Sequence, residues 1–402
     1  MKRILPVIVL SQFFCTSLWF AGNAVMGDII KNFGLDNRFL ANLTSSVQLG
    51  FICGTLVFAV LALADRFSPS RVFFTCAMIA ALLNLGICIN DLSVTTLLGF
   101  RFFTGFFLAG IYPVGMKIAS DYYQKGLGRS LGFLVGALVL GTSFPHLLKS
   151  FAASLPWKYV IVSISALATL GGLAMLLLVP DGPFRKPGQK LALTAFAKGF
   201  RNGHFRSAAY GYFGHMWELY TFWAFVPVML TTYQQYFHTE LNISFLSFLI
   251  IASGSLACVL GGLLAQVYGA KKIATIALGL SGLCCLLSPF LLFMGSVPVL
   301  LGFLFFWGLV VVADSPLFST LVAQNVAEES RGTSLTIVNC IGFSITIISI
   351  QCLKLLSENI NTKYIYLMLA AGPALGLAAL LRDSRPVAVK PKHHETDQNR
   401  LR

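Results

Sequence analysis

Charged residues are scarce in this sequence of 402 residues: Asp, Glu, Lys and Arg together make up 11%, whereas hydrophobic residues make up 56%. Soluble domains usually carry about 25% charged residues, so the composition excludes an ordinary soluble globular protein. Acidic residues are the rarest, with 15 against 29 Lys and Arg. The positive excess does not indicate a nucleic-acid partner, because the basic residues stand between apolar blocks and in the C-terminal tail.

Several chemical motifs are also absent from the sequence. It contains no Gly-rich loop ending in Lys-Ser or Lys-Thr, which argues against ATP as an energy source. The nine cysteines lie inside apolar blocks and lack the spacing of metal ligands. No nucleophile, base and orienting residue stand at a recognisable spacing. We therefore expect no catalytic residues, no metal and no cofactor.

Long apolar blocks are what the sequence does contain. Each has roughly 18 to 25 residues, the length of helix that crosses the hydrocarbon core of a bilayer. The sequence therefore predicts an all-α membrane protein with twelve transmembrane helices. These are expected at residues 4–26, 40–64, 71–90, 95–118, 129–149, 157–179, 207–231, 243–267, 272–294, 298–323, 332–356 and 363–381.

One long polar connection divides the predicted helices into two groups of six. It carries six Lys and Arg residues and follows the sixth helix. The sequence predicts an N-terminal six-helix bundle, a cytoplasmic linker, a C-terminal six-helix bundle and a disordered basic cytoplasmic tail. Their boundaries are expected at residues 1–180, 181–206, 207–381 and 382–402.

The distribution of Lys and Arg predicts the orientation in the membrane. Alternate connections, together with the tail, carry 21 of these residues on one side and 5 on the other. Positively charged connections stay in the cytoplasm. We expect a multi-pass protein of the cell (inner) membrane, monomeric, with both termini in the cytoplasm.

The two halves repeat each other at nearly one offset. Arg129 opens the fifth helix and Arg331 opens the eleventh, 202 residues later; Lys158 opens the sixth and Lys363 opens the twelfth, 205 residues later. Such internal repeats are typical of transporters built from two related halves. The repeat favours a transporter over a membrane protein of another kind.

The connection between the second and third helices contains Asp65, Arg66 and Arg71, with Leu61 and Ser68 at positions where a related pattern has glycine. The second half has Gly262, Gly269 and Lys271 but Gln266 in place of the acid. Arg101 and Gly105 stand four residues apart on the fourth helix. With the twelve blocks and the repeat, these motifs resemble the major facilitator superfamily over nearly the whole chain.

That resemblance implies two pseudo-symmetric bundles that work by alternating access. Helices one, four, seven and ten would line a central cavity, and helices two, five, eight and eleven would join the halves. Glycines on helices five and eight would allow close approach there: Gly132, Gly136, Gly141, Gly254, Gly261 and Gly262. The resemblance also implies a cytoplasmic gate formed by Asp65, Arg66, Arg71, Arg129 and Arg331.

The ionisable residues inside the predicted helices are the leading site candidates, because a charge at the centre of a spanning helix costs about 2.5 to 3.5 kcal/mol. Glu218 lies near the midplane, and His215 shares its helix face three residues away. We interpret them as a proton-coupling pair or, equally, as a structural pair. Arg101 is either a counter-charge to an anionic substrate or to Glu218, or a packing residue. Asp314, before Ser315 and Pro316, is either a cation-binding residue or the partner of a base at a kink.

Uncharged polar and aromatic residues form a second set of candidates. Asn23, Tyr212 and Trp223 are expected to line the substrate pocket, although helix packing explains them about as well. Lys117 is expected to snorkel to the headgroups at a cytoplasmic helix end. The partners predicted are a small-molecule substrate, protons and the lipid bilayer.

Together these patterns predict a secondary active transporter that moves a small solute and is coupled to protons. Import and export stay open at this stage, and a proton-driven drug or metabolite exporter is the first alternative. A non-transporting receptor or scaffold is the second. It would explain the helices but not the buried ionisable groups concentrated on helices four, seven and ten.

Overall fold

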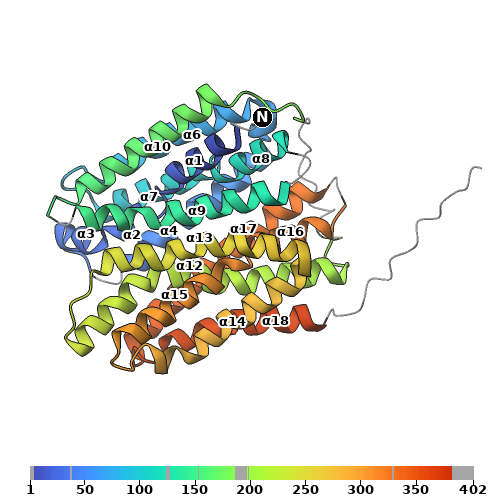
Figure 1. Ribbon diagram of the computed structural model, residues 1–402. Coiled ribbons are helices and arrows are strands. Elements are labelled where there is room, and N and C mark those ends of the chain that lie inside the picture. The colour runs from blue at the N-terminus through green and yellow to red at the C-terminus, as the bar shows by residue number, and fades with distance from the viewer. Residues whose placement is uncertain are drawn as a thin grey trace, which may run out of the picture.

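The computed structural model describes residues 4–36, 39–123, 127–152, 154–185, 197, 199–327 and 330–382. Within these ranges all regular structure is helical, and the helices lie roughly along one common direction (Figure 1). The all-α fold predicted from the sequence is confirmed. Predicted linker residues such as Lys186, Lys190 and Lys198, and tail residues 383–402, lie outside the described residues.

Helices from the first half of the chain form one side of the bundle in Figure 1. They are α1 (Ile4–Thr16), α2 (Ala21–Ala24), α3 (Met26–Phe33), α4 (Phe39–Val60), α5 (Leu63–Arg66), α6 (Pro69–Gly86), α7 (Val94–Leu108), α8 (Tyr112–Tyr122), α9 (Leu127–Phe151) and α10 (Lys158–Leu178).

Helices from the second half form the other side. They are α12 (Gly203–Phe237), α13 (Ile243–Tyr268), α14 (Ala270–Leu291), α15 (Val297–Ala313), α16 (Ser315–Gln324), α17 (Arg331–Asn359), the 3-10 helix η2 (Ile365–Ala370) and α18 (Ala371–Arg382).

Ten helical segments of the described chain are long and apolar enough to cross a membrane. The first helix, α1, is apolar but has only 13 residues, and the 35-residue α12 is less hydropathic because polar residues run along it. Leucines of α10 and α13, such as Leu177 and Leu256, are exposed on the outside, where lipid would cover them. The count of twelve crossings stays a prediction.

The predicted first helix, 4–26, is not continuous. It ends at Thr16, and short helices follow as α2 and α3, so the prediction of one unbroken helix was wrong. The predicted fourth and tenth helices are also divided, into α7 with α8 and α15 with α16. In both of these the second piece begins with a proline in its first turn, Pro113 and Pro316, where proline needs no backbone donor.

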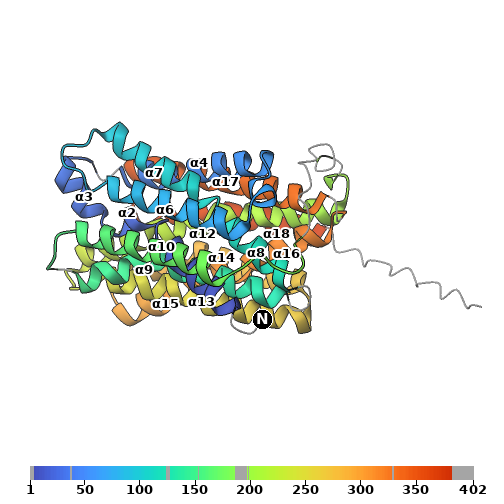
Figure 2. The same cartoon turned by 90° about the horizontal axis from the view of Figure 1, so that it is seen from above.

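The halves are joined mainly by two helix pairs, with a smaller contact between α9 and α16. The helix α9 packs against α13, and α4 packs against α17, on opposite sides of the bundle as seen in Figure 2. These are the second, fifth, eighth and eleventh predicted helices, as the resemblance implied. The helix α12 packs against one helix of each pair, α17 and α13, whereas α1 packs against α9.

The glycines predicted at this contact divide into three groups. A Cβ at Gly136 would lie 3.4 Å from the Ser255 carbonyl oxygen of the other half. One at Gly254 would lie 2.4 Å from Val312 of α15 and 3.5 Å from Val139 of the other half, so Gly254 packs mainly on α15. Gly141 instead packs against Thr16 of α1, and Gly261 against Ala313 of α15. Gly132 and Gly262 have nothing within 4 Å. The prediction therefore holds for Gly136 and in part for Gly254, and it was wrong for the other four.

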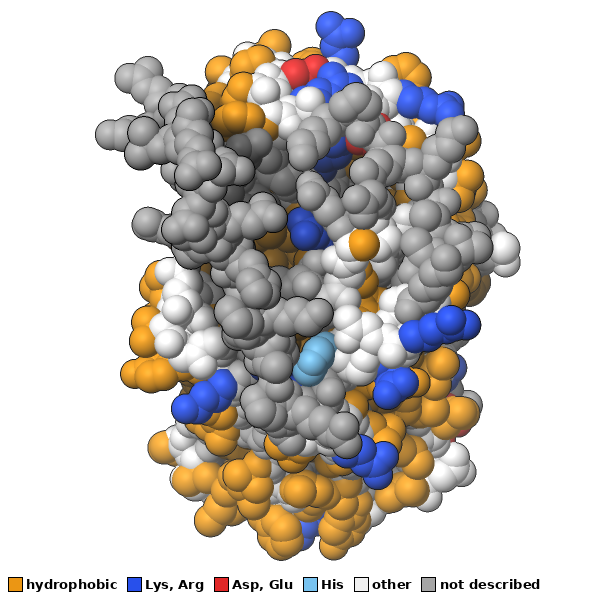
Figure 3. Space-filling model, turned by 90° about the vertical axis from the view of Figure 1, so that its right-hand side faces the viewer, with side chains coloured by type: hydrophobic (Ala, Val, Ile, Leu, Met, Phe, Trp, Pro, Cys, Tyr) orange, Lys and Arg blue, Asp and Glu red, His pale blue; other side chains and the backbone are white. Residues whose placement is uncertain are grey.

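Both ends of the described chain lie at the same end of the bundle in Figure 1, where α1 begins and α18 ends. Figure 3 views this end, and Lys and Arg side chains are spread over it with few Asp and Glu between them. At the opposite end polar side chains link the halves: Gln351 Nε2 lies 3.0 Å from Ser45 Oγ, and Asn242 Nδ2 lies 3.1 Å from Ser150 Oγ. The halves are therefore in contact at the end away from the termini.

Candidate functional site

The break after α1 places a buried cation at the centre of the first half. Where a helix ends, its last carbonyls lose their intrahelical donors. Arg101 Nη2, on α7, donates to the carbonyl oxygens of Leu18 at 3.2 Å and Trp19 at 2.6 Å. The guanidinium, which has no exposed surface, thus replaces the missing N–H groups at a depth where unsatisfied carbonyls cost several kcal/mol.

Close packing of α4 on α7 brings Arg101 to this position. A Cβ at Gly105 would lie 1.9 Å from the carbonyl oxygen of Val47, and one at Gly50 would lie 1.8 Å from that of Phe102. Only glycine fits at either place. Gly105 is one turn beyond Arg101 on the same face of α7, so the Arg–Gly spacing noted in the sequence has a physical reason.

The contacts of Arg101 are those of the packing alternative. In the described part of the chain its acceptors are neutral, namely the two carbonyls and Asn84 Oδ1 at 3.1 Å. The predicted pairing of Arg101 with Glu218 is not found, because Glu218 bonds within the second half. Sequence analysis missed Asn84, whose only signal was an amide inside an otherwise apolar predicted helix.

Aromatic rings from both halves meet at mid-length of the helices, and we call them the central aromatic cluster. Trp19 lies 5.7 Å from Tyr220 and 5.5 Å from Phe343 between ring centroids, at interplanar angles of 31° in both cases. Trp223 lies 5.0 Å from Tyr220. The members are Trp19 from the break, Phe51 of α4, Tyr220 and Trp223 of α12, and Phe343 of α17. The predicted site residue Trp223 is therefore central, whereas Phe51 and Phe343 were missed among 35 phenylalanines.

Several buried polar groups around this cluster have no partner among the described residues. Trp19 Nε1 and Trp223 Nε1 are both in this state, although each side chain is 1% exposed. The predicted residue Asn23 donates to Thr44 Oγ1 at 2.8 Å but leaves Oδ1 free, and Gln48, one turn further along α4, leaves both side-chain atoms free. Leaving a buried polar group without a hydrogen bond costs about 1 to 3 kcal/mol. Several such groups around one cluster therefore indicate a binding site, in which a ligand would supply the missing hydrogen bonds.

Glu218 lies on α12 and is held by three donors of the second half. Trp307 Nε1 donates to Oε1 at 2.6 Å, Cys285 Sγ lies 3.2 Å from Oε1, and Ser281 Oγ donates to Oε2 at 2.9 Å. The carboxylate therefore faces α14 and α15 rather than the other half. Of its partners, sequence analysis had noted only Cys285, as a small buried hydrophobe.

His215 pairs with Asp314 and not with Glu218. His215 Nδ1 lies 2.8 Å from Asp314 Oδ1, and both side chains are 1% exposed. The predicted His215–Glu218 pair was inferred from a shared helix face. The structure instead places Asp314, at the end of α15, next to the imidazole. Asp314 Oδ2 and His215 Nε2 have no partner in the described ranges.

The break at Asp314 is present, as its following proline indicated, but its backbone is not free. The Asp314 carbonyl accepts from the N–H groups of Leu317 and Phe318, both at 2.9 Å. The carbonyl that Pro316 leaves without its helical N–H donor is that of Val312, and Cys258 Sγ lies 3.5 Å from it. The His215 contact matches the alternative of an acid paired with a base at a kink. Cation binding at Asp314 stays a prediction.

Tyr212 lies on α12 but outside the central aromatic cluster. Its hydroxyl makes a short hydrogen bond with Asn339 Oδ1 of α17. Its ring is 6.1 Å from that of His215. Tyr212 thus connects the His215–Asp314 pair to α17, the helix that packs on the first half.

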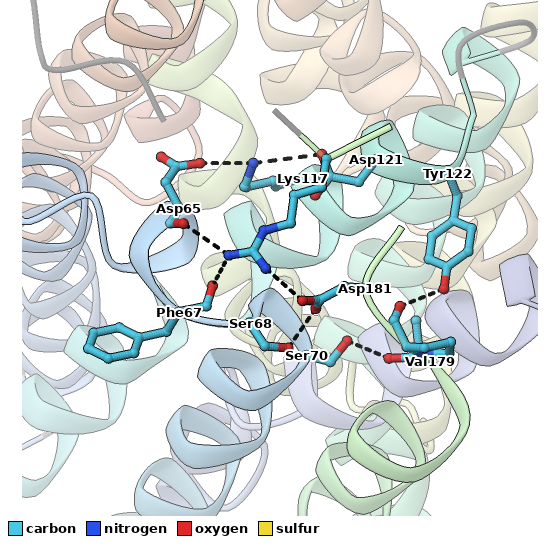
Figure 4. A network of polar contacts seen from close by, with 11 residues as sticks. Asp65, Phe67, Ser68, Ser70, Lys117, Asp121, Tyr122, Val179 and Asp181 are labelled. Atoms are coloured by element: carbon cyan, nitrogen blue, oxygen red, sulfur yellow. Dashed lines mark hydrogen bonds and ion pairs between the residues drawn. The ribbon is translucent and has the colours of Figure 1, made fainter. Parts of the chain in front are cut away.

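The predicted cytoplasmic gate residue Asp65 forms an ion pair inside the first half. Lys117 Nζ, on α8, lies 2.9 Å from Asp65 Oδ1 and 3.7 Å from Asp121 Oδ1, as Figure 4 shows. The expectation that Lys117 snorkels to the headgroups was wrong, because two carboxylates stand within its reach. The pair fixes α5 against α8.

Arg185 holds the start of the linker against the same turn. Its Nη2 donates to the carbonyl oxygens of Asp65 at 2.9 Å and Phe67 at 2.7 Å, and its Nη1 lies 2.6 Å from Asp181 Oδ2 (Figure 4). The sequence had counted Arg185 only as an orientation charge. It contacts the gate motif from 120 residues away in the chain.

The other predicted gate residues lie apart from the Asp65–Lys117 pair. Arg66 and Arg71 line a surface cavity of about 470 Å³ together with Arg185. Arg129 is in the first turn of α9, and its side chain lies outside the described part. Arg331 Nε donates to the carbonyl oxygen of Ala323 at 3.1 Å, which fixes α17 to α16.

No group of three or more possible metal ligands occurs among the residues that the structure describes. What the fold presents is a helical bundle of two halves, buried charges inside each, and unsatisfied polar groups where they meet. These features define a multi-pass membrane protein of the transporter class.

The chain belongs to the Major Facilitator Superfamily, whose sequence model matches residues 8–350 and 211–401. It is 32% identical over 181 residues to the niacin transporter NiaP of Acinetobacter baylyi, a match that spans 39% of this chain and 40% of that protein. The matched stretch is thus under half the length of that relative.

Solved structures share the fold at low identity. The human organic anion transporter MFSD10 (TETRAN) matches with a TM-score of 0.74 at 17% identity, covering 94% of this chain and 99% of its own. The proton:xylose symporter XylE matches with a TM-score of 0.75 at 13% identity, covering 96% of each chain. A bacterial homolog of the human lysosomal transporter Spinster, in an inward-facing and unoccupied conformation, matches with a TM-score of 0.67 at 15% identity, covering 94% of each chain.

Proposed function

We propose that this protein is a proton-coupled secondary active transporter that carries a small solute by alternating access. The observation that supports this most is the central aromatic cluster, in which rings of both halves enclose unsatisfied buried donors. A site shared by two halves is opened to either side when the halves rock, which is how transporters with related halves work. The organisation into bundles 1–180 and 207–381 belongs to this proposal.

The names of the similar proteins agree with transport of small solutes. One is named a transporter of niacin, one a transporter of organic anions, and one a symporter of protons and xylose. Their substrates differ, so family membership by itself does not identify the solute carried here.

We place proton coupling in the second half, at Glu218 and the His215–Asp314 pair. Glu218 is buried, and three donors of the second half hold its two carboxylate oxygens in the present conformation. Asp314 Oδ2 and His215 Nε2 lack partners in the described chain, so this pair can exchange a proton with water when the halves open. A structural role for both sets is the alternative.

The orientation proposed is that of a cell-membrane protein with both termini in the cytoplasm. The spread of Lys and Arg over the face seen in Figure 3 supports it. Contacts between the halves at the other end, through Gln351 and Asn242, would then close the external side. We expect the monomer to be the working unit.

Transport into proteoliposomes tests the coupling proposal. With a pH gradient across the membrane, the unaltered protein should accumulate its solute and collapse the gradient reported by a pH-sensitive dye. Glu218→Gln should abolish gradient-driven accumulation while exchange of labelled for unlabelled solute continues, because exchange requires no net proton movement. Glu240→Gln, the same chemical change at an exposed position between α12 and α13, is the control that should keep both. If Glu218→Gln still accumulates solute fully, Glu218 is not the coupling residue, and Asp314 becomes the candidate.

A further inference from the structure

We propose that the central aromatic cluster binds a small planar organic anion, its carboxylate accepting from the indole N–H groups of Trp19 and Trp223. This inference rests on the proposed transport function for its biological meaning, but it concerns binding and is tested by binding. The chemistry of the cluster specifies three properties of the ligand, namely planarity, hydrogen-bond acceptors and negative charge.

Planarity follows from how the rings are arranged. Trp19 makes shallow interplanar angles of 31° with both Tyr220 and Phe343, at centroid distances of 5.7 and 5.5 Å. Trp19 belongs to the first half and the other two to the second. When the halves part, these facing rings present flat surfaces to one another, and a flat ligand can take the place of the contact they now make.

Acceptor character follows from the unsatisfied donors. An indole has one N–H donor and no acceptor. Trp19 and Trp223 are both 1% exposed, and neither Nε1 has a hydrogen-bond partner in the described part of the chain. By contrast, Trp217 Nε1 donates to the Met368 carbonyl and Trp307 Nε1 to Glu218. The two unsatisfied indoles are therefore those in the cluster, and the groups that satisfy them must be acceptors.

Negative charge follows from the distribution of buried ions around the cluster. Arg101 Nη2 lies 2.6 Å from the carbonyl oxygen of Trp19, and Arg101 bonds only neutral oxygens among the described residues. Its Nε has no partner in the same ranges. The acids Glu218 and Asp314 both lie among side chains of the second half: Glu218 bonds Ser281 of α14 and Trp307 of α15, and Asp314 contacts His215. The first-half side of the cluster is therefore positive without a compensating acid, a field that favours an anion.

A small ligand is the suitable probe, because the rings of the cluster are in contact in the present conformation. Phe51 and Phe343 are in direct contact across the halves at 4.7 Å between centroids. One aromatic ring that carries one carboxylate combines the three required properties, and benzoate is the simplest such probe.

Equilibrium binding of radiolabelled benzoate to the full-length protein in lipid nanodiscs tests the inference. Three unlabelled compounds then compete with it. Benzamide is neutral, benzylamine is positively charged, and cyclohexanecarboxylate keeps the negative charge but has a non-planar ring. We expect benzamide and benzylamine to compete at least tenfold more weakly than benzoate, and cyclohexanecarboxylate several-fold more weakly. Equal competition by benzamide would overturn the anion assignment, and stronger competition by benzylamine would show a cation site. Absence of benzoate binding to the unaltered protein would overturn the proposal.

Substitution of single tryptophans locates the site. Trp223→Phe and Trp19→Phe keep a ring but remove the N–H, and each should weaken benzoate binding about tenfold, the loss expected for a hydrogen bond to a charged group. Trp157→Phe makes the same chemical change outside the cluster and should bind as the unaltered protein does. Thermal unfolding of each variant shows whether it is folded. Unchanged benzoate binding in both folded cluster variants would overturn the site.

Binding and transport fail separately in this design. If benzoate binds as expected but is not moved by liposomes containing the protein, the site assignment stands and the proposed transport function does not. If the liposomes accumulate another solute while benzoate fails to bind, transport stands and the inference about planar anions is overturned.

Discussion

His215 Nδ1 lies 2.8 Å from Asp314 Oδ1, so an imidazole in the long helix α12 is tied to the residue at which the tenth predicted helix breaks. Asp314 separates α15 from α16, and its own carbonyl accepts from two N–H groups of the following turn. This contact therefore holds α12 against the break between α15 and α16.

The pair gives the first prediction. Asp314→Asn keeps the size of the side chain but removes the charge, so gradient-driven accumulation should fall at least tenfold while exchange of solute changes by less than about threefold. Rates of both processes in the same liposomes provide the measurement. Asp91→Asn, the same chemical change at an exposed position between α6 and α7, is the matched control. Equal loss of exchange and accumulation would show that Asp314 supports folding or binding instead.

The second prediction concerns the Asp65–Lys117 ion pair at 2.9 Å. Asp65→Asn should slow exchange of solute by about fivefold or more and leave the equilibrium affinity within about twofold, because the pair lies at the mouth and not at the central aromatic cluster. Comparing the exchange rate with the dissociation constant separates the two effects. Exchanging the charges, with Asp65→Lys and Lys117→Asp together, should restore part of the rate if the direct contact matters. A large loss of affinity with normal exchange would contradict a gate.

The third prediction concerns Arg101 and the break after α1. Arg101→Lys keeps the charge, but an ammonium group cannot span Asn84 and the carbonyls of Leu18 and Trp19 as the guanidinium fork does. We expect a loss of about 2 kcal/mol of stability, the order expected for hydrogen bonds to a charged group. Thermal unfolding in detergent would measure it as a fall in Tm. Arg71→Lys, beside the surface cavity, should leave Tm unchanged; an equal fall in both variants would mean that the effect is not specific to the break.

The fourth prediction concerns the backbone contact between α4 and α7. Gly105→Ala would place a Cβ 1.9 Å from the Val47 carbonyl oxygen, so the helices must separate and Arg101 must move. The yield of folded protein should fall severalfold in size-exclusion chromatography. Gly99→Ala is the control on the same helix, because a Cβ there meets nothing within 4 Å. A normal yield for Gly105→Ala would show that α7 can shift without loss.

The sequence by itself determined the class of fold. The apolar blocks are long enough to cross a bilayer, and within lipid a helix satisfies the hydrogen bonds of its own backbone. The repeated positions of residues such as Arg129 and Arg331 divide the chain into two halves. Composition also identified Glu218, Asp314 and Arg101, because a buried charge is rare enough to stand out in apolar surroundings. It identified Asp65 through a motif, although the motif named no partner.

The tertiary structure alone decided which of these residues meet. Periodicity shows that His215 and Glu218 share a face of one helix, but not which neighbouring helix each side chain contacts, and the structure assigns Asp314 to one and Trp307 to the other. The break after Thr16 left little trace in the sequence, since it depends on a donor supplied by Arg101 from 83 residues away. Phe51 and Phe343 became site candidates only when α4 and α17 placed them together. Contacts between helices depend on rotations and breaks that local sequence does not encode, so the partners of buried groups are fixed only when the whole bundle packs.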